Sequence, residues 1–139
     1  MKPSYNYIDA DLIAFRSEVL RLVNAERAKV GLPALQSSNA LHKAAQVRAD
    51  EISTDYGHDR PDGSSCFTVL QEKSISYNYA GENIASGQTT PQQVVREWMN
   101  SPGHRANILN TKYTHLGIGI TENSGGKYGG YSWSQMFIG

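Results

Sequence analysis

The spacing of apolar residues changes along this chain, and that change limits the folds that the sequence can adopt. Up to about residue 109, apolar side chains recur at steps of three and four, which is typical of helices that bury one face. From residue 115 onward they alternate with polar or small residues, which is typical of half-buried strands. Helices followed by strands favour an α+β fold with an antiparallel sheet.

The local signals place most of the elements. Helices are expected at residues 9–30, 39–54, 66–73 and 91–100, with further turns at 103–109. Strands are expected at 115–121 and 128–138, joined by a hairpin at 123–126. Residues 77–87 fit either a short strand or an extended turn. Thr90-Pro91 and Ser101-Pro102 have the form of helix openings, Ser37 or Ser38 is expected to cap the helix at 39–54, and Gly31 is placed to end the first helix.

Length and charge exclude several classes of protein. A chain of 139 residues indicates one domain. The 13 basic and 13 acidic side chains cancel, and they also balance within residues 1–60 and within the remainder, so no basic stripe for nucleic acid is present in the sequence. No apolar run reaches the roughly 18 residues that a membrane span needs.

The single cysteine, Cys66, excludes an internal disulfide framework and a cysteine-based zinc cluster. The first seven residues lack the apolar segment of a signal peptide. We therefore expect either an intracellular protein or the mature part of a longer one.

Three side chains stand out as candidates for a functional site. His58 and His104 each follow a glycine, where a helix meets irregular backbone, and functional side chains concentrate at such positions. Glu82 lies in a stretch of small and apolar residues, so its carboxylate either faces solvent or is buried with a partner. The other two histidines are interpreted as structural: His42 as a surface residue of its helix, and His115 as the start of a strand.

Two motifs give the chain a family resemblance. Gly-Glu-Asn-Ile-Ala at 81–85 and Trp-Met-Asn-Ser-Pro-Gly-His-Arg-Ala-Asn-Ile-Leu-Asn at 98–110, together with Leu-Val-Asn-Ala-Glu-Arg at 22–27, resemble the CAP superfamily. This superfamily comprises cysteine-rich secretory proteins, antigen 5 and pathogenesis-related-1 proteins, and the resemblance is to its bacterial SCP-like branch. It implies an α-β-α sandwich with a small antiparallel sheet between helices. Residues 11–139 would form the domain, after an N-terminal extension of residues 1–10.

The resemblance also implies a site. Members of the superfamily place two His and two Glu in a central cleft that binds a divalent metal in some of them. His58, Glu82 and His104 match three of these positions, and Ser101 stands where eukaryotic members have the second Glu. Glu97, one turn earlier, falls on the outer side of its predicted helix. Two His and one Glu suit zinc and leave a coordination position open.

Several functions agree with these residues. The first is a secreted or cell-surface binding or effector module that is not an enzyme, with a metal-capable cleft. Its partner would be a small molecule, a lipid or sterol, an extracellular protein or a cell-wall component. The second is a metal-dependent, peptidase-like hydrolase that uses the same cleft. The third is a structural or adhesive surface domain in which the His/Glu cluster only links helices to the sheet.

Overall fold

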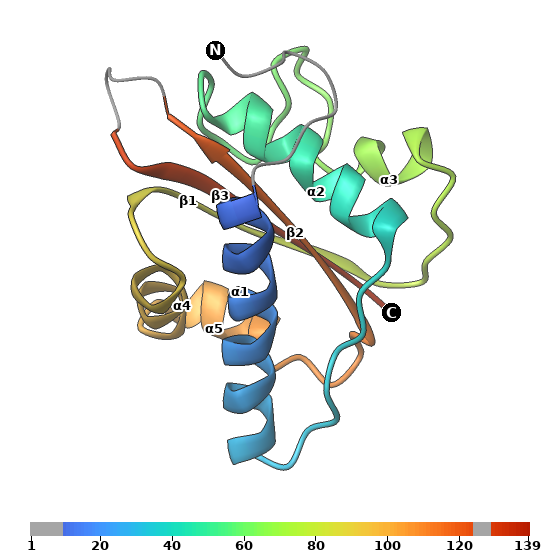
Figure 1. The fold of residues 1–139 in the computed structure, drawn as a ribbon. Coiled ribbons are helices and arrows are strands. Elements are labelled where there is room, and N and C mark those ends of the chain that lie inside the picture. The colour runs from blue at the N-terminus through green and yellow to red at the C-terminus, as the bar shows by residue number, and fades with distance from the viewer. Residues whose placement is uncertain (1–9, 124–128) are drawn as a thin grey trace.

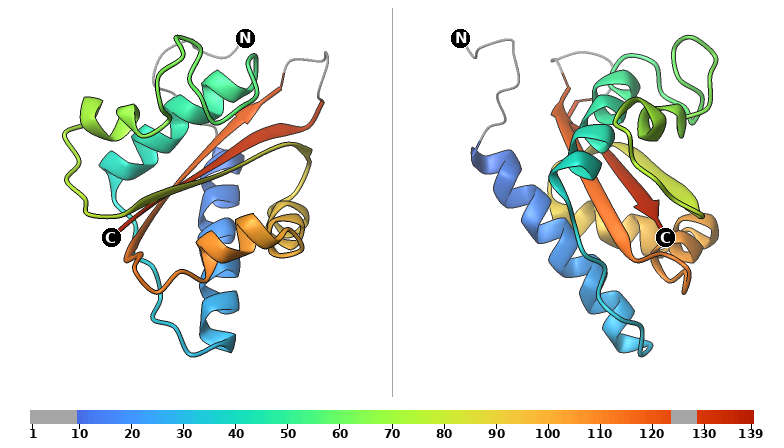
Figure 2. Two further views of the ribbon diagram at one scale, coloured as in Figure 1. Left: turned by 180° about the vertical axis from the view of Figure 1, so that it is seen from behind. Right: turned by 90° about the vertical axis from the view of Figure 1, so that its right-hand side faces the viewer.

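A computed structural model describes residues 10–123 and 129–139 of the protein. Two layers of helices enclose a small sheet (Figures 1 and 2). Helices α2 (Asn39–Ile52) and α3 (Thr68–Glu72) cover one face. Helices α1 (Ala10–Lys29), α4 (Pro91–Met99) and α5 (Pro102–Ile108) cover the other. The predicted α-β-α sandwich is confirmed.

The sheet consists of β1 (Ala80–Gln88), β2 (His115–Glu122) and β3 (Tyr131–Ile138). The strand order is β1-β3-β2, and both pairings are antiparallel. In the register, Glu82 of β1 lies opposite Met136 of β3, and Gly117 of β2 lies on the other side of Met136. The last strand is therefore central, and β1 is left at an edge of the sheet.

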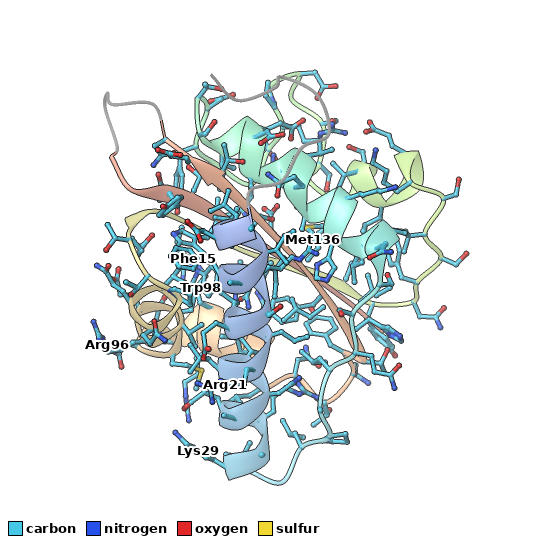
Figure 3. All side chains as sticks on the ribbon, in the orientation of Figure 1. Phe15, Arg21, Lys29, Arg96, Trp98 and Met136 are labelled. Carbon is cyan, nitrogen blue, oxygen red and sulfur yellow. The ribbon has the colours of Figure 1, made fainter. Side chains whose placement is uncertain are left out.

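Successive strand residues separate into two cores, because their side chains point to opposite faces. The larger core joins Trp133 and Phe137 of β3 to α1 and α4, and the smaller joins Met136 to α2 and α3. Figure 3 shows Phe15 and Trp98 on the side of α1 and α4, and Met136 close to α2.

Two glycines let α2 lie very close to β2. A methyl group at Gly117 would be 2.3 Å from the carbonyl oxygen of Leu41, and one at Gly119 would be 2.2 Å from that of Ala45. The alternation of glycine with leucine and isoleucine in this strand thus has two causes. The glycines face α2, and the large side chains at 116, 118 and 120 enter the larger core.

The local predictions agree with the structure where it can be compared with them. Ser38 and Thr90 accept hydrogen bonds from the first turns of α2 and α4, and Gly31 follows α1 with a φ of 78°. Residues 77–87, left open between a strand and a turn, contain most of β1. The predicted extension at 1–10 lies almost wholly outside the described residues, as does most of the hairpin at 123–126. Among the described helices, none combines the length and apolar character that crossing a membrane requires.

Candidate functional site

Glu82 is buried at the sheet edge and paired with an arginine. Its side chain is 1% exposed, and that of Arg48, from α2, is fully buried. Nε of Arg48 donates to Oε2 of Glu82 at 2.7 Å, and Nη2 lies 3.4 Å from Oε1. An unpaired charge in this position would be costly, so Arg48 is what allows the carboxylate to lie inside the fold.

His58 follows α2 and contacts the same carboxylate. Its Nδ1 lies 2.9 Å from Oε1 of Glu82, while 60% of its side chain remains exposed. A carboxylate that is paired with Arg48 only accepts hydrogen bonds, so Nδ1 carries the proton and donates it. In the neutral ring this leaves Nε2 with its lone pair available.

His104 lies in the first turn of α5 and is half-buried. Burial, and secondly the nearby charge of His58, lower the pKa of its imidazole. His58 thus contacts Glu82 directly, whereas His104 is linked to the same strand through its main-chain oxygen, which accepts a hydrogen bond from Asn83.

Two asparagines join the strand that carries Glu82 to the helix that carries His104. Nδ2 of Asn83 donates to the main-chain oxygen of His104 at 3.1 Å. Nδ2 of Asn107 donates to the main-chain oxygen of Glu82 at 3.2 Å and to Oδ1 of Asn83 at 2.9 Å. His104 and Asn107 are three residues apart and so lie on neighbouring parts of the α5 surface. The asparagines of both sequence motifs thus fix α5 against β1.

Cys66 lies beside the carboxylate but is not a reactive thiol. It is 5% exposed. Burial, and next the negative charge of Glu82, raise the pKa of Cys66 to about 12. The thiolate is the form of cysteine that attacks electrophiles and binds metals. At neutral pH the thiol of Cys66 is therefore protonated, and it packs beside Glu82 as a weakly polar group.

Neither Glu97 nor Ser101 has a hydrogen bond to Glu82 among the contacts of the described residues. Glu97 is exposed and accepts a hydrogen bond from Nε2 of Gln88 at 3.0 Å, in agreement with its predicted outward position. Ser101 takes the N-cap position of α5, without a side-chain capping bond.

The interpretation of His42 as a surface residue is wrong. Its ring is half-buried, and Nδ1 accepts a hydrogen bond from the main-chain nitrogen of Ile118 at 3.0 Å. Gln46, one turn further along α2, exchanges hydrogen bonds with both main-chain groups of Ile120. Helix α2 thereby covers the outer edge of β2, which would otherwise present unpaired backbone groups. His115 lies elsewhere, with its Nδ1 2.8 Å from Oγ1 of its neighbour Thr114.

The three candidate residues fit a three-ligand metal site only in part. Within residues 10–123 and 129–139, no three His, Cys, Asp or Glu side chains form a group that could hold a metal ion. Both oxygens of Glu82 are already engaged, by Arg48 and by His58. The two imidazoles remain suitable donors, and Glu82 has the place of a carboxylate that orients one of them. Ligation by all three residues stays a prediction.

Comparison with known families agrees with the motifs. The model of the CAP, or cysteine-rich secretory protein, family matches residues 20–137, which is most of the chain. This chain belongs to the CAP family. Its single cysteine shows that the domain forms here without internal disulfides.

Curated relatives are similar to this chain over most of its length. The Bacillus subtilis (strain 168) protein YkwD is 44% identical over 91% of this chain and 48% of its own. The membrane protein YlbC of the same organism is 32% identical over 74% of this chain and 30% of its own. The chain thus spans about half or less of these curated relatives.

Two solved structures have a similar fold. An extracellular SCP-domain protein from Bacillus anthracis has a TM-score of 0.82 at 25% identity, covering 96% of this chain and 44% of that one. An outer surface protein of Borrelia burgdorferi has a TM-score of 0.76 at 24% identity, covering 94% and 95% of the two chains.

Proposed function

We propose that this chain is an extracellular binding module in which His58 and His104 hold a divalent cation. The observation that carries the proposal is the contact between Nδ1 of His58 and the buried Glu82. A carboxylate behind an imidazole fixes its tautomer and ring orientation, as is found around histidine ligands of zinc. The extracellular setting is supported by the similar proteins described as extracellular or outer-surface.

The residues present suggest a two-histidine site that is open to solvent. Neutral imidazole nitrogens suit zinc and similar metals, and both rings come from segments fixed to β1. When bound, such a cation supplies a positive centre with open positions for water or for oxygen atoms of a partner molecule. Glu82 orients His58, and Arg48 balances the charge of Glu82. We infer a binding role because the two imidazoles can hold a cation, to which a partner molecule can bind, whereas the described residues of the site include no positioned nucleophile.

The proposal is tested by titrating the chain with zinc at pH 7.5 and measuring the heat of binding. We expect one zinc ion per chain, and at least about tenfold weaker binding in His58→Ala and in His104→Ala. His115→Ala is the matched control, because its ring contacts Thr114 away from the site. Absence of heat from the wild type, or equal affinity in both site variants, would contradict the metal-binding role. A loss of thermal stability in His104→Ala without any zinc effect would favour the purely structural role.

A second candidate function, binding of an anionic amphiphile such as a fatty acid, is supported by a groove between α4 and α5. The groove has a volume of about 490 Å³ and is lined by Met99, Asn100, Pro102, Arg105, Ala106 and Leu109. Its apolar side chains suit an acyl chain, and Arg105 suits a carboxylate.

Displacement of a fluorescent fatty acid tests this second candidate. Ala106→Trp, which fills the groove, is expected to abolish binding, whereas His58→Ala leaves it unchanged. Equal binding by wild type and Ala106→Trp would exclude the groove as the binding site.

A further inference from the structure

His58 belongs to a segment that has little regular structure of its own. Between the end of α2 at Ile52 and the start of α3 at Thr68, the only strand-like pairing described is a single bridge from Asp59 to Ser65. A ring that is 60% exposed, on such a segment, has few apolar contacts to hold it. Its position must therefore come from polar contacts.

Those contacts form a chain of alternating charges that begins at the site. Arg48 pairs with Glu82 on one side, and its Nη1 donates to Oε1 of Glu51 at 2.7 Å on the other. Nη2 of Arg60 donates to Oε2 of Glu51 at 2.8 Å, and Nη1 of Arg60 donates to Oε2 of Glu72 at 2.6 Å. The network thus links β1, α2, the His58 segment and α3.

The network holds the backbone on both sides of His58. Nη2 of Arg48 donates to the main-chain oxygen of Gly57, the residue directly before it. Arg60, two residues after it, is held by Glu51 and by Oγ1 of Thr68 at 3.0 Å. An arginine fork suits such simultaneous contacts, because its planar guanidinium presents donors in fixed directions.

We propose that Arg48 and Arg60 are positioning residues that clamp the backbone around His58, so that its ring stays on Glu82 and its Nε2 stays available to a ligand. Arg48 also sets the carboxylate that the ring contacts. Arg60 is the better probe, because the hydrogen bonds of its guanidinium within the described residues go to Glu51, Glu72 and Thr68. This inference is tested in two ways. The zinc measurement rests on the proposed function, whereas the measurement of the His58 tautomer does not.

The metal-free test uses nuclear magnetic resonance of the imidazole nitrogens at pH 8, where an ordinary histidine is neutral. In the wild type, His58 is expected to be protonated at Nδ1 alone. In Arg60→Met we expect a mixture of both tautomers at His58, with the signals of His104 unchanged. Arg60→Lys, which keeps the charge without the fork, is expected to give an intermediate mixture. The control is Arg21→Met, because Arg21 lies on α1 (Figure 3) and its Nε donates to Glu18.

Zinc affinity supplies the second measurement. Arg60→Met and Arg48→Lys are each expected to bind zinc about 10- to 100-fold more weakly than the wild type, with Arg21→Met unchanged. If the wild type binds no zinc, the proposed function fails while the tautomer measurement still tests the clamp. The positioning role is overturned if Arg60→Met lowers the melting temperature but leaves the tautomer of His58 as in the wild type. The side chain of Arg60 is 11% exposed, whereas that of Arg48 is fully buried. Substitutions at Arg60 therefore disturb the core less, and they test the clamp even if Arg48→Lys does not fold.

Discussion

Replacing Arg27 by alanine is expected to lower the free energy of unfolding by about 4 kcal/mol. Arg27 is 1% exposed, and its guanidinium donates to main-chain oxygens. Its Nε donates to Pro33 at 2.9 Å, and Nη1 donates to Ile108 at 2.8 Å and to Asn110 at 3.0 Å. Alanine removes every donor and leaves the carbonyl oxygens in place. Each buried oxygen without a partner costs about 1–3 kcal/mol.

The measurement is urea unfolding of the wild type, Arg27→Ala and Arg27→Lys, with the slope against urea checked to be equal. Lysine keeps a charge and donors but loses the planar fork, so we expect an intermediate loss of about 2 kcal/mol. Arg21→Ala is the control, because its side chain is 65% exposed, and it should lie within about 0.5 kcal/mol of the wild type. A loss below about 1.5 kcal/mol in Arg27→Ala would mean that water replaces the guanidinium without difficulty.

Arg27 and Arg48 illustrate what sequence patterns reveal and what they omit. Arg27 lies four residues after Val23 on the buried stripe of α1, and Arg48 lies among the alanines on that of α2. The helical step alone therefore places both cations on buried faces. Their partners lie far along the chain, 34 residues away for Glu82 and 81 for Ile108. Only the folded sheet brings these groups together, so the ion network around His58 was not predicted.

The elements with strong local signals were predicted. Strand β1, which the sequence left open between a strand and a turn, is the exception, and it has a physical reason. Caps such as Ser38 and Thr90 act within one turn, so the sequence contains their whole mechanism. Strand β1 is buried on both faces from Gly81 to Ala85, and so it lacks the alternation that indicates a strand. The prediction that His58, Glu82 and His104 share one site came from the family resemblance, because no spacing rule links residues on a loop, an edge strand and a short helix; of its contacts, the structure has that between His58 and Glu82.

The role of His42 could not be predicted because its partner is a main-chain group. The ring covers the nitrogen of Ile118 on β2, and any residue at position 118 other than proline would supply the same donor. The sequence around His42 contains ordinary helix residues and gives no sign of this contact. The contact has a consequence for stability in acid, because the ring can accept the hydrogen bond only while Nδ1 is unprotonated.

We expect the protein to lose about 2–3 kcal/mol of stability as the pH falls from about 6.5 to about 4, through His42 alone. Burial, and next the positive charge of Arg16, lower the pKa of His42 from 6.5 to about 4. Between pH 6.5 and about 4, His42 is protonated in the unfolded chain but stays neutral in the folded one. The stabilisation is therefore complete above pH 6.5, decreases through this window and is lost below pH 4. The lowered pKa of His104 adds a change of the same sign.

The variant His42→Asn separates this contribution from those of other groups. Its Oδ1 can accept from the nitrogen of Ile118 as Nδ1 does, but the amide does not titrate. Urea midpoints are measured for both proteins at several values between pH 7.5 and 4. The wild type is expected to lose more stability than His42→Asn over this range, whatever their difference at pH 7.5. The carboxylates and His104 are common to both proteins, so their effects cancel in the comparison. Two parallel curves would show that His42 is protonated in the fold without strain, and that the cover of the β2 edge by α2 does not depend on its neutral ring.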